Sequence, residues 1–189
     1  MSRRRRALFL DRDGVVNVDH GYVHTIERFE FVDGIFEFCA QAAASGFELV
    51  IVTNQSGIAR GLFSEAQFHE LMAWLGQQFA SRGLKLARYY YCPDHPDGMG
   101  RYRRRSFMRK PAPGMLLRAA DDLDLDLSRC VLIGDRESDI AAGRAAGLAA
   151  TIHHATGASP APGDANVSVA DLTQAREWLA GWNDAYSAD

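Results

Sequence analysis

Short apolar runs recur along the chain, and each of them stops at polar residues or at glycine. They predict buried strands at residues 7–11, 47–53, 88–92, 130–134 and 148–153. Apolar positions at helical spacing predict helices at residues 34–45, 64–82, 113–123, 138–146 and 171–182. Ser64 and Gln67 have the spacing of a capping box, which favours a helix start there. The alternation predicts an α/β protein with a Rossmann-like, doubly wound parallel sheet.

The lengths of the intervals limit what can cover this sheet. Residues 17–28 leave room for a flap, and residues 93–108 for a loop that would roof a pocket. Neither interval can hold a folded cap, so we expect a single domain over residues 1–189 without a large cap domain. Residues 1–6 are expected to form a flexible basic terminus, and residues 155–164, which contain two prolines and two glycines, a loop before the last helix.

The first predicted strand runs directly into Asp11-Arg12-Asp13-Gly14. Ligands of doubly wound sheets bind at the carboxyl ends of the strands, so both carboxylates are expected to face a crevice. Two acids in such a place repel each other unless a cation joins them, which makes the pair a candidate Mg²⁺ site. An aspartate beside Mg²⁺ can also attack phosphorus and form an aspartyl phosphate. Taken alone, the motif fits an acidic turn equally well.

Three further segments at the predicted strand ends carry complementary chemistry. Residues 53–57, Thr-Asn-Gln-Ser-Gly, offer a hydroxyl, amides and turn N–H groups that can cradle phosphate oxygens. Arg109 and Lys110 supply positive charge before the helix at 113–123, and Asp135 and Asp139 follow the fourth strand. Each segment alone is typical of a helix cap or a turn. Together, at successive strand ends, they favour phosphoryl transfer.

Segments 11–17, 53–61, 109–115 and 134–139 resemble the signature motifs of the haloacid dehalogenase (HAD) superfamily of phosphatases. With Gly21-Tyr22-Val23 after the first motif, they are similar to one branch, the D-glycero-D-manno-heptose 1,7-bisphosphate 7-phosphatases, to which histidinol-phosphate phosphatases are related. The resemblance covers residues 7–150. It implies a HAD fold and a Mg²⁺-dependent phosphoric monoester hydrolase that acts through an aspartyl phosphate, in heptose nucleotide biosynthesis for lipopolysaccharide or capsule.

The resemblance also implies roles for the motif residues. Asp11 would be the nucleophile and a metal ligand, and Asp13 the general acid and base, with its backbone carbonyl on Mg²⁺. Thr53 and Lys110 would hold the transferring phosphoryl group, where positive charge stabilises the transition state. Asp135 would complete the Mg²⁺ site, with Asp139 behind it. The residues expected to line the substrate pocket are Asp19, His20, Gly21, Tyr22, Thr53, Asn54, Gln55, Ser56, Arg109 and Lys110.

The roof loop departs from the pattern of that branch. Its members carry a structural zinc ion there, bound by a Cys-x-His pair and a later Cys-x-Cys pair. The aligned positions of this chain are Cys92, Asp94, Ser106 and Met108, and His95 is one residue out of register. A tetrahedral zinc site needs four nitrogen, sulfur or carboxylate ligands, so we expect no zinc. The absence of zinc would bear on whether residues 92–108 form an ordered loop, and on where that loop places Arg109.

Other charged and aromatic residues have more than one reading. Arg3 to Arg6 fit a solvated terminus better than a nucleic-acid contact. The roof loop holds a second basic cluster, which is either a solvated face or a grip on a second phosphate, since arginine forks match phosphate geometry. Its members are Arg101, Arg103, Arg104 and Arg105. We expect packing or capping roles for His153 and His154, and core positions for Trp74, Trp178 and Trp182.

Composition is ordinary for a small globular enzyme, with 47% hydrophobic and 24% charged residues in 189. The net charge of −3 gives no reason to expect bulk attraction to nucleic acid or membranes. No apolar stretch approaches membrane-spanning length, and the basic N-terminus lacks the features of a secretory signal. We therefore expect a cytoplasmic monomer acting on a small phosphosugar, with Cys39 and Cys130 as buried thiols.

Three other functions stay open on the sequence. One is a phosphatase for histidinol phosphate or another small phosphate monoester. Another is a polynucleotide 3′-phosphatase, suggested by the arginine runs and the open roof. The third is a phosphosugar-binding protein without turnover. The presence of Asp11, Asp13, Lys110 and Asp135 argues against the third.

Overall fold

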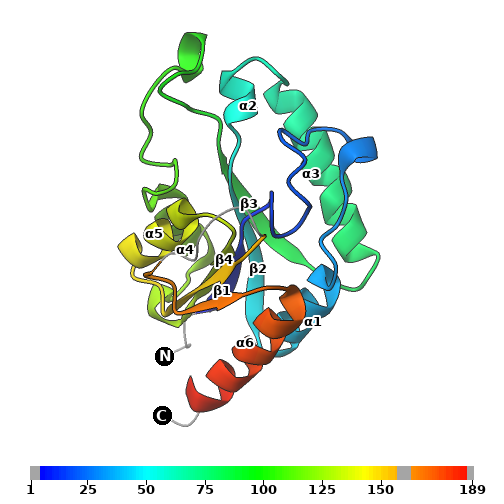
Figure 1. The fold of residues 1–189 in the computed structure, drawn as a ribbon, viewed down its shortest axis with the longest axis vertical. Coiled ribbons are helices and arrows are strands. Elements are labelled where there is room, and N and C mark those ends of the chain that lie inside the picture. Colours follow the sequence, from blue (N-terminus) through cyan, green and yellow to red (C-terminus); the bar gives the residue numbers. More distant parts are fainter. Residues whose placement is uncertain (1–4, 157–162, 187–189) are drawn as a thin grey trace.

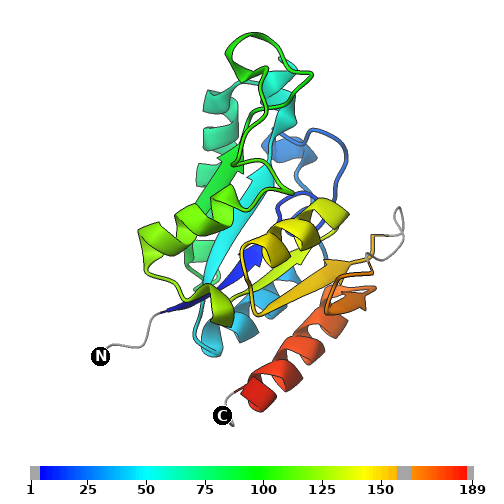
Figure 2. The same cartoon turned by 90° about the vertical axis from the view of Figure 1, so that its left-hand side faces the viewer.

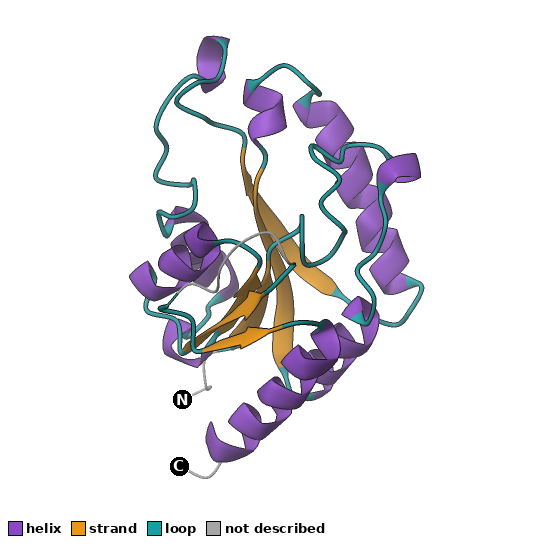
Figure 3. Ribbon diagram, viewed as in Figure 1, coloured by secondary structure: helices purple, strands orange, loops and turns teal. Residues whose placement is uncertain are grey.

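The computed structural model describes residues 5–156 and 163–186 of the chain. These residues form a six-stranded parallel sheet in the order β3-β2-β1-β4-β5-β6 (Figure 1, Figure 3). The strands are β1 (Arg6–Leu10), β2 (Phe47–Asn54), β3 (Leu86–Cys92), β4 (Val131–Gly134), β5 (Ala150–His154) and β6 (Val167–Val169). The predicted doubly wound architecture is confirmed, because the strand order runs outward in both directions from β1 and β4.

Helices cover both faces of the sheet, and side chains of β1 alternate between them. Leu8 and Leu10 join the core under α1 (Ile35–Ala44), α3 (Glu65–Ala80) and α6 (Leu172–Tyr186). Ala7 and Phe9 join the core under α4 (Gly114–Leu123) and α5 (Glu137–Ala145) on the opposite face (Figure 1, Figure 2). A strand that is apolar on both faces can only sit inside a covered sheet, as β1 does. Among the described residues, no helix is both long and apolar enough to cross a membrane.

The predicted elements agree closely with the structure. The capping box at the start of α3 is confirmed, since Ser64 Oγ accepts from the Gln67 N–H at 3.2 Å and Gln67 Oε1 accepts from the Ser64 N–H at 2.9 Å. Several short elements were not predicted: β6, α2 (Ser56–Ala59) and the 3₁₀ turns η1 (Ile26–Arg28), η2 (Gly100–Tyr102) and η3 (Leu127–Arg129). Single turns and three-residue strands contain too few residues for a periodic pattern.

The N-terminal segment is more ordered than expected at two of its arginines. Arg6 already belongs to β1 and lies over the Phe47 ring, 4.1 Å from its centroid. Arg5 pairs with Glu48 at 3.1 Å. The expected flexible terminus therefore does not extend to these two residues, and residues 1–4 lie outside the described part of the chain. The predicted loop 155–164 also lies largely outside it, at residues 157–162.

The expected burial of several individual residues is confirmed. Cys39 and Cys130 are buried free thiols, and Trp74, Trp178 and Trp182 pack against the core. His153 and His154 are buried at the end of β5, where they make packing and hydrogen-bond contacts. Between Asp11 and the start of β2 at Phe47 the chain builds only the flap, η1 and α1, and between Cys92 and Lys110 only the roof loop with η2. The carboxyl ends of β1, β2 and β4 are thus left free of any folded cap.

Candidate active site

Three aspartates meet at the carboxyl ends of the two central strands. Asp11 follows β1, Asp135 follows β4, and Asp139 lies in the first turn of α5. All three are buried, and one carboxylate oxygen from each lies within 4.8 Å of the other two. Burial, followed by the charge of Asp139, raises the pKa of Asp11 well above its usual value. The same two causes raise the pKa of Asp135 to about 6. Such a cluster is electrostatically incomplete without cations.

Lys110 supplies one of those cations. Its Nζ lies 2.9 Å from Asp11 Oδ1 and 2.5 Å from Asp139 Oδ1, and it donates a hydrogen bond to the Val52 carbonyl at 2.9 Å. Burial alone would lower the pKa of Lys110, but the charges of Asp11 and Asp139 outweigh it and raise that pKa. The lysine therefore stays an ammonium beside the carboxylate that the motif marks as a nucleophile.

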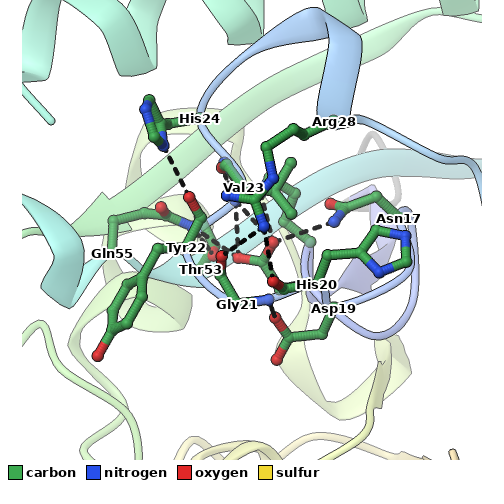
Figure 4. A network of polar contacts seen from close by, with 12 residues as sticks. Asn17, Asp19, His20, Gly21, Tyr22, Val23, His24, Arg28, Thr53 and Gln55 are labelled. Atoms are coloured by element: carbon green, nitrogen blue, oxygen red, sulfur yellow. Dashed lines mark hydrogen bonds and ion pairs between the residues drawn. The ribbon is translucent and has the colours of Figure 1, made fainter. Parts of the chain in front are cut away.

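The carboxylate of Asp13 does not belong to this cluster. It accepts hydrogen bonds from Arg12, from Asn17 Nδ2 at 3.1 Å and from Gln55 Nε2 at 3.0 Å. Gln55 Nε2 also contacts Thr53 Oγ1 at 2.8 Å, which links the end of β2 to Asp13. Figure 4 shows Asn17 and the flap residues Asp19 to His24 beside Thr53 and Gln55. Two neighbouring carboxylates are thereby held in different environments, one beside a lysine and one beside amides and an arginine.

Gly14 lets the loop after β1 approach Asp135 closely. It adopts a left-handed conformation with φ of +86°, and a Cβ at this position would lie 2.3 Å from Asp135 Oδ2. The Gly14 carbonyl accepts a hydrogen bond from His154 Nδ1 at 2.8 Å. Burial lowers the pKa of His154 and so favours the neutral ring that makes this contact. The sequence places His154 at a strand end but gives no sign that it supports the acidic loop.

A pocket of about 470 Å³ opens above these groups. Asp11, Asp13 and Asp139 lie in its wall. All residues expected to line a substrate pocket do so except His20, which pairs with Glu30 at 2.7 Å. Asn54 connects the end of β2 to the segment that carries Lys110. Its Nδ2 donates to the Lys110 carbonyl at 3.0 Å, and its Oδ1 accepts from the Lys110 N–H at 3.1 Å. The structure adds lining residues that the sequence reading missed, namely Gly57, Pro111, Arg136 and Ser138.

The arginines that line the pocket are not those of the roof-loop cluster. Arg101 pairs with Glu65 at 3.0 Å and Arg104 with Asp94 at 2.9 Å, and neither lines the pocket. Arg103 and Arg105 are also absent from its wall. Arg109 does line it, and Arg136 lies opposite the flap, where it pairs with Asp19 at 2.8 Å. Arg136 could have been suspected from its place between Asp135 and Asp139.

The aligned zinc-ligand positions also have defined contacts. Cys92 and Asp94 are buried, and burial raises the pKa of the Cys92 thiol. Asp94 Oδ2 pairs with Arg104 Nε at 2.9 Å, and the Asp94 carbonyl accepts from Arg109 Nη1 at 3.3 Å. Ser106 Oγ accepts from the Met108 N–H at 3.2 Å. An internal ion pair and backbone hydrogen bonds therefore connect the two ends of the roof loop.

Strand order, acid cluster and buried lysine together define a HAD-like hydrolase, and comparison with known proteins agrees. The HAD-hydrolase-like family model matches residues 107–173. The chain is 52% identical over 150 residues, 79% of each sequence, to D-glycero-alpha-D-manno-heptose-1,7-bisphosphate 7-phosphatase of Burkholderia mallei. It is 45% identical over 182 residues to the corresponding beta-heptose enzyme of Escherichia coli K12, covering 93% of this chain and 95% of that one. The chain belongs to the heptose bisphosphate 7-phosphatase family of HAD phosphatases and is a phosphoric monoester hydrolase.

Solved structures give the same result. A D,D-heptose 1,7-bisphosphate phosphatase from B. bronchiseptica, complexed with magnesium and phosphate, superposes with a TM-score of 0.78 at 30% identity. The match covers 93% of this chain and 98% of that one. A HAD-like phosphatase from Mesorhizobium loti superposes with a TM-score of 0.84 at 35% identity, covering 94% and 85% of the two chains. The first of these structures supports Mg²⁺ as the metal of this family.

Proposed function

We propose that this chain removes the 7-phosphate of D-glycero-D-manno-heptose 1,7-bisphosphate in the biosynthesis of heptose nucleotides. One observation carries the proposal: the buried Asp11–Lys110 pair lies beside a pocket that also exposes Arg109 and Arg136. A phosphate at Asp11 would leave a second phosphate of a compact sugar within the reach of these arginines. The names of the two relatives described above support this choice of substrate.

The acid cluster fits Mg²⁺. The ion prefers oxygen ligands, and Asp135 Oδ1 is buried without a hydrogen-bond partner among the described residues. In this proposal Asp11, Asp135 and the backbone carbonyl of Asp13 hold the ion, and Asp139 lies next to them. When bound, Mg²⁺ offsets the negative charge of the acids and of the phosphoryl oxygens.

The side chains of the pocket then perform two displacements. Asp11 attacks phosphorus, the bond to the sugar oxygen breaks, and Asp13 gives that oxygen its proton. Water next attacks the phosphorus of the phospho-Asp11 intermediate and gives a proton to Asp13. The bond between phosphorus and the Asp11 oxygen breaks, which restores the Asp11 carboxylate and releases inorganic phosphate. Lys110 and the Thr53 hydroxyl stabilise the oxygens on which charge collects. Since Lys110 already contacts Asp11, this positive charge needs little rearrangement when the phosphate binds.

We further propose that the roof loop contains no zinc. The Asp94 carboxylate is paired with Arg104, and the other aligned positions offer one thiol, a hydroxyl and a thioether. Elemental analysis of protein purified without chelators should find no stoichiometric zinc. One zinc ion per chain would contradict this proposal.

Phosphate release tests the proposed function directly. The wild-type protein should release phosphate from heptose 1,7-bisphosphate and from p-nitrophenyl phosphate only with Mg²⁺, and Asp11→Asn should abolish both activities. Asp97→Asn, an exposed change in the roof loop, serves as the control and should keep them. Values of kcat/KM for both heptose anomers, histidinol phosphate and a 3′-phosphorylated oligonucleotide would identify the substrate. A preference for either of the last two would contradict the proposal. No release of phosphate from any ester, with tight sugar-phosphate binding retained, would favour a binding protein.

We also propose that the enzyme works as a cytoplasmic monomer formed by one domain over residues 1–189. All three cysteines are buried free thiols, as expected in a reducing compartment. Light scattering at the concentration of the activity assay should give the mass of one chain.

A further inference from the structure

Arg12 is the largest side chain that the fold buries completely. Arginine is among the residues least often found inside proteins, because its charge must be removed from water. Pairing a buried charge rarely does more than offset that cost, so stability alone is a weak reason to place an arginine here. Arg12 lies between Asp11 and Asp13 at the end of the central strand β1, and this position indicates a role in the active site.

The guanidinium of Arg12 grips the carboxylate of Asp13 through two nitrogens. Nη2 lies 2.6 Å from Asp13 Oδ1 and 2.8 Å from Oδ2, and Nε lies 3.2 Å from Oδ1. On its other side the guanidinium faces the ring of Phe68 in α3, 5.9 Å from the ring centroid. A planar fork held in this way fixes the orientation of the carboxylate, which a lysine ammonium would not do.

The same guanidinium also holds the flap. Arg12 Nη2 donates to the Val23 carbonyl at 2.6 Å, and Val23 is itself fully buried. Val23 directly follows the flap residues Asp19, Gly21 and Tyr22, which line the pocket (Figure 4). One nitrogen atom therefore connects the carboxylate that must face the leaving group with the segment that covers the substrate.

We propose that Arg12 is a positioning residue that sets the orientation of Asp13 and couples it to the flap. This inference rests on the proposed function, in which Asp13 protonates the oxygen that leaves phosphorus. A flap settled on the substrate keeps the Val23 carbonyl on Arg12, and Arg12 in turn keeps Asp13 aimed at that oxygen. Departure of a poor leaving group then depends on flap contacts made at a distance from the breaking bond.

The test compares two leaving groups. A sugar alkoxide needs a proton to leave, whereas p-nitrophenolate leaves without one. In the first displacement, which kcat/KM reports, a misplaced acid therefore slows only the sugar ester. The loss of Asp13 as the base for water falls on both esters alike and lowers kcat. Arg12→Lys and Arg12→Met should lower kcat/KM for heptose 1,7-bisphosphate about 100-fold and for p-nitrophenyl phosphate by at most about threefold. Equal losses on the two substrates, or no loss on either, would overturn the proposal. Thermal unfolding should show that both variants fold, with one cooperative transition above the assay temperature.

Arg28→Lys is the matched control. Arg28 also fastens the flap, by donating to the His20 carbonyl at 2.8 Å, but it makes no hydrogen bond to Asp13 among the described residues. Its replacement should leave the ratio of the two kcat/KM values unchanged. A changed ratio would mean that loosening the flap in any way is sufficient, and the specific role of Arg12 would be overturned.

An Asp13→Asn background gives a second measurement. Once the acid is missing, Arg12→Lys should lower the residual kcat/KM for the bisphosphate by no more than about twofold, because residues that act as a unit are not additive. A further 100-fold loss would overturn the proposal. An unchanged leaving-group ratio would leave the proposed function intact, whereas no hydrolysis of any phosphate ester by the wild type would overturn both.

Discussion

Nζ of Lys110 lies 2.9 Å from Oδ1 of Asp11, and both side chains are buried. The contact lets one ammonium serve two purposes. It offsets the charge of the acid cluster in the empty site, and in the proposed mechanism it would also stabilise the phosphoryl oxygens during the reaction. The pair is part of a larger set, since Lys110 also contacts Asp139 and the Val52 carbonyl.

Replacing Lys110 should therefore affect both stability and turnover. We expect Lys110→Met to lower kcat/KM by a factor of about 10² to 10³. Without Mg²⁺ it should also lower the free energy of unfolding by about 3 kcal/mol, because the buried carboxylates of Asp11 and Asp139 lose the ammonium that pairs with them. Chemical denaturation with and without Mg²⁺ measures the second effect, and Mg²⁺ should restore part of the loss. Lys85→Met, an exposed change at the only other lysine, is the control and should alter neither quantity.

Magnesium affinity should depend on pH below about 6. The raised pKa of Asp135, about 6, means that a proton competes with the ion for this carboxylate in the folded protein. Titration calorimetry should show a nearly constant Kd at higher pH and about tenfold weaker binding for each unit below 6. The raised pKa of Asp11 adds to the slope. A Kd that is unchanged between pH 5 and pH 7 would contradict this prediction.

The grip on the non-reacting phosphate should come from Arg136 and not from the roof-loop cluster. Arg136→Gln should raise KM for heptose 1,7-bisphosphate about tenfold or more, since an arginine–phosphate contact is charge-assisted. KM for p-nitrophenyl phosphate, which has one phosphate, should change little. Arg105→Gln is the matched control, because Arg105 lies outside the pocket wall. Steady-state kinetics with both esters measure these KM values. A larger rise in KM for the bisphosphate from Arg105→Gln than from Arg136→Gln would contradict this prediction.

The Asp94–Arg104 pair should keep the roof loop ordered without a metal. Arg104→Gln leaves the buried Asp94 carboxylate with a weaker partner and should cost about 1–2 kcal/mol, less than a fully buried pair because the arginine is two-thirds exposed. Hydrogen exchange should become faster across residues 93–108, and KM for the bisphosphate should rise because Arg109 loses its support. Asp97→Asn should change none of these, and the same holds for chelator treatment of the wild type.

Much of the fold could be predicted because its signals are local. Apolar runs that end in Asp11, Thr53 and Asp135 mark the strand ends, and the hydrogen bonds of Ser64 and Gln67 need only four consecutive residues. In a parallel sheet, strand ends meet at one edge, so the motif residues could be expected to share a pocket before their distances were known.

The parts that sequence reading missed depend on contacts between distant segments. Arg12 has a residue type that is usually exposed, and only the position of Val23 and Phe68 explains its burial. For the roof-loop arginines the sequence leaves a solvated face and a phosphate grip both open, and only the structure places Glu65 beside Arg101 and Asp94 beside Arg104. Pairing partners at this separation leave no local pattern that could predict them.

The position of β1 between β2 and β4 has a consequence for how the chain holds together. Asp11 comes from the first half of the chain and Asp135 from the second, and their strands are hydrogen-bonded neighbours. A divalent ion bound by both carboxylates would hold the ends of β1 and β4 together. Separation of these two strands would then require the ion to dissociate first. Local unfolding between β1 and β4 should then become rarer as the Mg²⁺ concentration rises. The ion would stabilise the sheet in addition to its part in the reaction.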